Sequence, residues 1–462
     1  MPPSFLLVLG LALLQICYAH RINYRNYHLY KFKPKQDVME FLHEVEESEE
    51  TGSYFDLEGN RLPVLDFFAE PNRDQPDAYV LVAPTFKPSF LQILADHRVN
   101  QINLISPDIQ TDIDEEKNQA IHRRKRRRRN VFISNGPSEL RSFDIFSYNA
   151  HDKIVNHLKA LSKYKPEMIT FYNITKTFEG RDLVGVKITS PNSQVVKKSM
   201  LIDGGVHARE HISIAVSVYM IDRLVMDYEN NGKIKWLLDN FDFWIIPSAN
   251  PDGYEYSRTT DRMWRKTRSK DEKVNKWCYG ADANRNWGFR WGQVGATRSP
   301  CSSTYAGRSA YSEPEVVGLR EFVKENVQNL KVYVSFHAYG QLFLSPWGYT
   351  NERPGNYRDQ QIAAQYAVNA IRNETGAVYT YGSIAEVMYP ASGTSIDYFQ
   401  SQGVPFVYGV ELRPMETSNA GFTIPASEIE PTGREMVAAF YEIGQYVNGN
   451  LPKRLLLKRR RQ

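Results

Sequence analysis

Cysteine is scarce in this chain of 462 residues, and long apolar segments are almost absent. The only long apolar run covers residues 6–14, which is too short to cross a bilayer. Hydrophobic residues make up 42% of the chain and charged residues 24%, which argues against both widespread disorder and a membrane-embedded body. Internal repeats are also absent from the sequence. At this length, two or three folded units are expected.

The N-terminal residues have the pattern of a secretory signal peptide. After the apolar run, Cys17-Tyr18-Ala19 places a small residue before His20, as at a cleavage site, although residues 1–5 contain no Lys or Arg. We therefore expect residues 1–19 to be removed and the protein to be secreted and extracellular. In that compartment the remaining cysteines, Cys278 and Cys301, are expected to form a disulfide worth about 3 kcal/mol. Two buried thiols are the alternative.

Positive charge is concentrated in two short tracts. Residues 123–129 read RRKRRRR, and the C-terminal tail at residues 452–462 carries six Lys and Arg residues. Because the whole chain has a formal charge of only +4, the rest of it is acidic. Neither tract contains aromatic residues, which argues against nucleic-acid binding. In a secreted chain, a multibasic run instead predicts a cleavage site for a trypsin-like or furin-like protease.

The order of the predicted elements divides the chain at the multibasic tract. Residues 20–122 mix alternating and helical patterns, which predicts a small α+β unit, and residues 123–129 read as an exposed linker. Residues 130–451 alternate β-branched apolar runs with longer helical segments, which is typical of an α/β sheet. Strands are predicted at residues 27–32, 79–82, 200–203, 241–247, 331–336 and 404–410, and helices at residues 35–47, 88–96, 212–227, 314–326, 359–375 and 433–447. This is the layout of a zymogen.

Three candidate metal ligands follow predicted strands. His207 and Glu210 come shortly after the strand at residues 200–203, and His337 comes directly after the strand at residues 331–336. The ends of strands in open α/β sheets are where ligands bind. Two histidines and one glutamate leave a fourth position open, which is typical of a catalytic zinc site. On their own, a His-x-x-Glu pair is a weak signal and His337 could be a hydrogen-bonded core histidine.

A third predicted strand, at residues 404–410, ends at Glu411. A carboxylate at the same edge of the sheet is a candidate general base, because a positioned base accelerates proton transfer by about 10²- to 10⁴-fold. A surface acid or a salt-bridge partner is the alternative for Glu411 considered alone.

Taken together, these residues resemble the zinc metallocarboxypeptidases of the carboxypeptidase A/B family. The resemblance covers residues 130–451 and rests on six motifs in one order. The motifs are His207-x-x-Glu210, Met263-Trp-Arg-Lys-Thr-Arg268, Asp282-Ala-Asn-Arg-Asn-Trp287, Ser335-Phe-His337-Ala-Tyr-Gly-Gln341, Tyr389-Pro-Ala-Ser-Gly393 and Glu411-Leu-Arg413. The resemblance implies a mixed, mostly parallel central sheet flanked by helices, and a ferredoxin-like propeptide domain at residues 20–122. It also implies one zinc ion per catalytic domain, a monomer, and hydrolysis at the C-termini of peptides or proteins.

The resemblance further implies how the reaction proceeds. His207, Glu210 and His337 would hold the zinc ion, a zinc-bound water would be the nucleophile, and Glu411 would be the general base. Arg265 would stabilise the oxyanion as charge develops.

The same resemblance implies how a substrate is held. Arg285 and Asn284, closed over by Tyr389, would bind the C-terminal carboxylate, because a guanidinium can grip a carboxylate with two hydrogen bonds. Arg209 and Tyr339 would line the substrate approach. Asp282 would orient a zinc-bound imidazole.

The position that is acidic in members preferring Lys or Arg matches Ile396. The other side chains that map to this pocket, Leu344, Ile384, Met388 and Ala391, are also apolar, so release of aliphatic or aromatic residues is predicted. Thr394 and Gly409 depart from the family pattern and could reshape the pocket. The alternatives are a basic-residue-specific (B-type) carboxypeptidase and an inactive peptide-binding pseudoenzyme.

Overall fold

The computed structural model describes residues 21–71, 76–127, 138–191, 193, 195–415 and 421–453. The predicted signal peptide, residues 128–129 of the multibasic tract and the tail beyond residue 453 lie outside these ranges. Within the ranges, no helix combines the length and the apolar character needed to cross a membrane.

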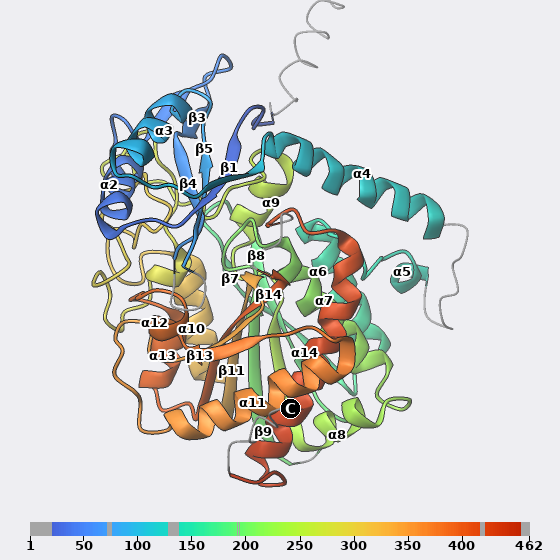
Figure 1. Ribbon diagram of the computed structural model, residues 1–462. Coiled ribbons are helices and arrows are strands. Elements are labelled where there is room, and N and C mark those ends of the chain that lie inside the picture. The colour runs from blue at the N-terminus through green and yellow to red at the C-terminus, as the bar shows by residue number, and fades with distance from the viewer. Residues whose placement is uncertain are drawn as a thin grey trace, which may run out of the picture.

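The N-terminal unit is a four-stranded antiparallel sheet with two helices, at the top of Figure 1. Its main elements are β1 (His28–Phe32), α2 (Gln36–Glu47), β4 (Leu65–Ala69), β5 (Ala78–Val82), α3 (Lys87–Asp96) and β6 (Ile102–Ser106), with a small hairpin of β2 (Ser53–Phe55) and β3 (Arg61–Pro63). The strand order β4-β5-β1-β6 is the ferredoxin-like arrangement that the family resemblance implied. Val38, Met39 and Leu42 of α2 share one core with β5, which is buried along its whole length.

Helix α4 (Ile109–Arg127) leads from this unit to the rest of the chain. Ile109 and Ile113 at its start are buried. Glu116 accepts hydrogen bonds from Nε and Nη2 of Arg262, both at 2.8 Å. The helix then continues through residues 123–127, where the sequence predicts an exposed linker. Arg and Lys are good helix formers, so a helix that begins on buried isoleucines can extend into the multibasic tract.

The C-terminal unit is built on a mixed, mostly parallel sheet, as predicted, and this sheet has eight strands. The strand order is β13-β12-β14-β11-β9-β10-β8-β7. The four central strands are parallel, and their outer neighbours β12 and β8 are antiparallel to them. The strands are β7 (Ile169–Lys176), β8 (Asp182–Ile188), β9 (Lys198–Gly204), β10 (Phe241–Ile246), β11 (Leu330–Gly340), β12 (Leu342–Ser345), β13 (Thr380–Ser383) and β14 (Phe406–Met415). Every residue of β10 is buried, as expected for a strand with helices on both faces.

Helices cover the two faces of this sheet with two separate cores. The first core includes residues of α6 (His151–Tyr164), α7 (His211–Met226), α8 (Gly232–Asn240), α11 (Tyr357–Thr375) and α14 (Ile429–Val447). The second includes residues of α10 (Pro314–Asn326), α12 (Ile384–Val387) and α13 (Ser395–Ser401). The shorter elements are α5 (Ser138–Arg141), α9 (Pro251–Thr259), η1 (Ala283–Arg285) and η2 (Ala426–Glu428).

The predicted strands and helices are all present, with ends displaced by a few residues. Two strands continue further than predicted. β11 and β14 stay paired beyond the end of β9, so that His337 lies beside Glu411 and Ala338 beside Leu412. His337 and Glu411 therefore lie within strands, and the prediction that they follow the strand ends is wrong.

Candidate metal centre and active site

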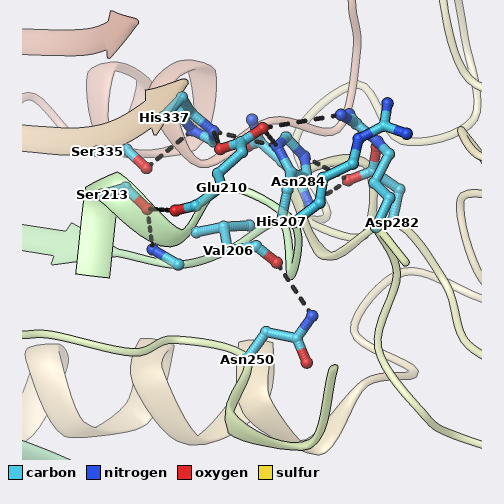
Figure 2. Close-up of polar contacts among 12 residues, drawn as sticks. Val206, His207, Glu210, Ser213, Asn250, Asp282, Asn284, Ser335 and His337 are labelled. Carbon is cyan, nitrogen blue, oxygen red and sulfur yellow. Dashed lines mark hydrogen bonds and ion pairs between the residues drawn. The ribbon is translucent and has the colours of Figure 1, made fainter. Parts of the chain in front are cut away.

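Three side chains converge in a buried cluster, shown in Figure 2. His207 lies in the loop after β9, Glu210 immediately precedes α7, and His337 lies on β11. Ser213 fixes the loop, because its hydroxyl donates to the Glu210 carbonyl oxygen and accepts from the Gly205 N–H. The two histidines and Glu210 each expose 5% or less of their surface.

Both imidazoles present Nδ1 to the Glu210 carboxylate. The His207 nitrogen lies 2.7 Å from Oε1, the His337 nitrogen lies 3.1 Å from Oε2, and the two nitrogens are 3.2 Å apart. Ligand atoms bound to one tetrahedral zinc ion, about 2.0–2.1 Å from it, are roughly 3.3 Å from one another. Only small movements would admit the ion, so the type of these donors and their spacing fit zinc.

The cluster combines a buried negative charge with two titratable rings. Burial alone would raise the pKa of the Glu210 carboxyl, but His207 and His337 hold that pKa well below its usual range. Burial alone would lower the pKa of His337, but the Glu210 carboxylate beside it raises that pKa to about 9. The carboxylate therefore favours positive charge on its neighbours, as a proton or as a metal ion.

Asp282 lies on the far side of the His207 ring from Glu210. Its Oδ1 is 3.2 Å from Nε2 of His207, and its Oδ2 accepts a hydrogen bond of 2.8 Å from Nη2 of Arg265. Burial would raise the pKa of Asp282, but Arg265, His207 and Arg285 keep it well below the usual range. An ionised Asp282 thus contacts the histidine nitrogen that faces away from the metal cluster.

The residues predicted to hold a substrate carboxylate lie together on this side of the cluster. Arg285 donates from Nε to the Gly295 carbonyl oxygen at 2.6 Å, and the side-chain oxygen of Asn284 accepts from the Ser395 N–H at 3.0 Å. Burial raises the pKa of the Tyr389 hydroxyl, and the charges of Arg285 and Arg265 oppose that shift. The tyrosine is therefore close enough to both guanidinium groups for their charges to act on it.

Glu411 and Tyr339 line one cavity together with His207, Arg265 and Tyr389. Asn284, Arg285 and Ile396 lie outside this lining. Ile396 lies on α13 with only 2% of its surface exposed, and it borders Gly409 on β14, where an added Cβ would lie 3.7 Å from its Cγ1. Met388, which the sequence assigns to the same specificity pocket, does line the cavity, so the two adjoin at Met388.

The cavity measures about 80 Å³, whereas pockets for small ligands usually measure about 300–1,000 Å³. The N-terminal unit closes one side of the cavity, where His43, Glu46, Phe67, Phe68 and Glu70 form part of the wall. No motif in the sequence marked these five residues. Their role depends on how two units pack, which residue spacing does not encode.

Arg209 shows this packing most clearly. Its guanidinium pairs with the carboxylate of Asp66 and donates to the Phe67 carbonyl oxygen at 3.2 Å. It also lies over the ring of Phe422, 4.3 Å from the ring centre. The sequence predicts that Arg209 lines the substrate approach. In this structure its guanidinium instead binds Asp66 and Phe67 of the N-terminal unit.

The disulfide predicted between Cys278 and Cys301 is confirmed. Arg61 of the N-terminal unit donates to the sulfur of Cys301 at 3.0 Å, and nearby the Ser299 hydroxyl donates to the Glu47 carbonyl oxygen at 2.7 Å. The loop that the disulfide closes is therefore part of the contact between the two units.

Comparisons with known proteins agree with this site. The family model described as zinc carboxypeptidase matches residues 154–439. The chain is 34% identical to zinc carboxypeptidase A 1 of Drosophila melanogaster over 91% of both proteins, and 38% identical to carboxypeptidase B of Astacus astacus over 66% of this chain and 98% of that one. The solved structure of carboxypeptidase A from Helicoverpa armigera superposes with a TM-score of 0.80 at 26% identity, covering 93% of this chain and 99% of that one.

Zinc binding at the cluster is expected to weaken steadily as the pH falls. Because the pKa of His337 is about 9 without metal, zinc must displace a proton from it at every lower pH. The apparent Kd should therefore rise about tenfold for each pH unit below 9, as measured by chelator competition between pH 8 and pH 6. In Glu210→Gln, the rise of the apparent Kd with falling pH should begin only near the ordinary histidine pKa of about 6.5. A Kd that stays constant between pH 8 and pH 6 would contradict the assignment of His337 as a zinc ligand that loses a proton on binding.

Proposed function

This chain belongs to the zinc carboxypeptidase family, and we propose that it is the secreted, monomeric zymogen of a member that releases aliphatic or aromatic residues. The family membership makes the chain a zinc-dependent hydrolase that acts on peptide C-termini, with His207, Glu210 and His337 at the zinc site. The observation that supports the specificity is Ile396, which is buried and apolar where a basic residue would require a carboxylate.

The side chains around the cluster divide the chemistry between them. A zinc ion there supplies Lewis-acid chemistry, lowering the pKa of water from 15.7 to about 7 and polarising the scissile carbonyl. Glu411, beside His337 on the neighbouring strand, takes the proton of the attacking water and passes it to the leaving amine. Arg265 donates to the developing oxyanion, and its link to Asp282 keeps the guanidinium on the zinc side of the site.

Arg285 makes the enzyme an exopeptidase by binding the free carboxylate at the end of the substrate. The Gly295 and Asn284 carbonyl oxygens hold its guanidinium in place before a substrate arrives. Asn284 provides a further hydrogen bond, and Tyr389 closes over the bound carboxylate. Because Arg285 is 2% exposed in the precursor, the substrate reaches it only when the cleft is open.

The N-terminal unit acts as the inhibitory propeptide in this proposal. It pairs Asp66 with Arg209 and also supplies Glu46, which accepts from the Ser303 hydroxyl at 2.6 Å. The Glu116–Arg262 pair holds α4 to the C-terminal unit. Cleavage at residues 123–129 by a trypsin-like or furin-like protease would cut the covalent connection between the two units, after which the N-terminal unit can dissociate from non-covalent contacts such as this pair.

The inactive-pseudoenzyme alternative is tested by replacing the proposed base in the cleaved enzyme. We expect Glu411→Gln to lower kcat about 10²- to 10⁴-fold, because the amide cannot accept a proton, while the zinc content stays at one ion per chain. Glu321→Gln, a surface change on α10, is the matched control. Undiminished turnover of Glu411→Gln would show that another group is the base.

Specificity is tested with two peptides that differ only in a C-terminal Phe or Arg. The cleaved enzyme should release Phe faster, since the pocket at Ile396 offers a guanidinium no countercharge. Ile396→Asp should reduce kcat/KM for Phe at least tenfold and improve release of Arg, because a buried carboxylate needs a cation as partner. Faster release of Arg by the unmodified enzyme would instead support the B-type alternative, to which the Astacus relative belongs by name.

The propeptide contact is tested in the uncleaved precursor. Asp66→Ala leaves the Arg209 guanidinium buried without its carboxylate, which typically costs about 3–5 kcal/mol in a buried pair. The precursor should therefore hydrolyse a small substrate at least tenfold faster than the unmodified precursor. The control is Asp77→Ala, which removes a partly exposed pair with Lys31 in the same unit. If neither variant hydrolysed the substrate faster than the unmodified precursor, the Asp66–Arg209 pair would not be the inhibitory contact.

A further inference from the structure

A line of hydrogen bonds leads away from His337 on the side opposite the metal cluster. Nε2 of His337 lies 3.0 Å from Oγ of Ser335, and that hydroxyl lies 2.6 Å from Oδ1 of Asp203. Oδ2 of Asp203 accepts from the Tyr333 hydroxyl at 2.5 Å. Figure 2 shows Ser335 next to the His337 ring. The four residues expose between 0% and 4% of their surface, so water does not replace these partners.

The sheet places these groups by register. Tyr333, Ser335 and His337 alternate along β11 and therefore share one face. Asp203 is the partner of Ser335 on the parallel strand β9. Side chains of paired residues lie on the same face of a sheet, so the carboxylate meets the hydroxyl without any loop being involved.

The chemistry of the groups sets the direction of each bond. Burial raises the pKa of Asp203, and the hydrogen bonds from Ser335 and Tyr333 oppose that shift. As a carboxylate, Asp203 only accepts, so both hydroxyls donate to it. Ser335 has one proton and has already donated it. Its oxygen can then only accept from His337, which keeps a proton on Nε2. Nδ1, which faces Glu210 and His207, is then the ring nitrogen that gives up its proton to bind zinc.

We propose that Ser335 and Asp203 are positioning residues that hold His337 in the tautomer and orientation required for zinc binding through Nδ1. His207 has the carboxylate of Asp282 directly behind it, and His337 has the carboxylate of Asp203 behind it through one hydroxyl. Each zinc-binding imidazole is thus supported by its own buried acid. Such outer partners typically change metal affinity about 10- to 100-fold when removed.

Two variants of the full-length precursor test this proposal. Ser335→Ala removes the acceptor for the His337 proton and should raise the Kd for zinc about 10- to 100-fold in chelator competition. Asp203→Asn keeps the shape of the side chain, but its NH₂ group can donate to Ser335. The serine would then donate to Nε2 of His337 and favour a proton on Nδ1, where the metal binds. Asp203→Asn should therefore weaken zinc binding at least as much as Ser335→Ala.

The matched control is Ser199→Ala on the neighbouring strand β9. Ser199 is 2% exposed and its hydroxyl also donates a 2.6 Å hydrogen bond, but to the Gln328 carbonyl oxygen at the far end of the sheet. Thermal unfolding of the metal-free proteins measures any general structural effect. The visible spectrum of the cobalt-substituted proteins reports the ligand geometry independently of activity.

The proposal predicts that Ser335→Ala and Ser199→Ala unfold at similar temperatures without metal, while only Ser335→Ala has lower zinc affinity and an altered cobalt spectrum. If both serine variants bound zinc as tightly as the unmodified protein, the proposal would be overturned. Equal losses in both would also overturn it, because the effect would then be structural. If Asp203→Asn does not fold, the comparison of the serine variants still decides the question.

Discussion

The register of the parallel strands β9, β11 and β14 is the constraint on which the active site depends. It places Asp203 beside Ser335 and Glu411 beside His337. The loop after β9 has five residues between Gly204 and Glu210, and two of them, His207 and Arg209, belong to the site. A slip of one residue in β11 would turn His337 to the opposite face of the sheet. The hydrophobic sheet core therefore fixes the chemistry as well as the fold.

Burial of charge makes the polar parts of the site interdependent. Asp203, Glu210 and Asp282 each expose 3% or less of their surface. An isolated buried ion costs several kcal/mol, so each carboxylate needs its own partners. Two imidazoles surround Glu210, a guanidinium and an imidazole surround Asp282, and two hydroxyls reach Asp203. Removing any one partner would leave a buried carboxylate incompletely paired and so destabilise the folded site. The polar groups of the site therefore depend on one another as one network.

Local patterns in the sequence were enough to predict much of this arrangement. Alternation and helical spacing predicted the elements of both units, and the motifs around Glu210 and His337 predicted the zinc ligands. The extension of β11 past His337 was missed, because it depends on pairing with β14, a strand that lies more than sixty residues away along the chain. The contact of Asp66 with Arg209 was also missed, since it joins residues 143 positions apart, one in each unit. Neither contact has a signature in residue spacing.

The same physical requirement links the catalytic cleft to the unit that covers it. In the proposed zymogen, Arg209 belongs to the wall of the cleft that receives peptides, and any segment that buries this cation must provide it with partners. The N-terminal unit does so with the Asp66 carboxylate, the Phe67 carbonyl oxygen and the Phe68 ring, which are groups that a peptide also carries. Under the proposed function, the covering contact therefore uses the kinds of interaction that Arg209 would offer to a substrate. Additional contacts outside the cleft, such as the pair between Glu116 and Arg262, provide attachment that a free peptide lacks.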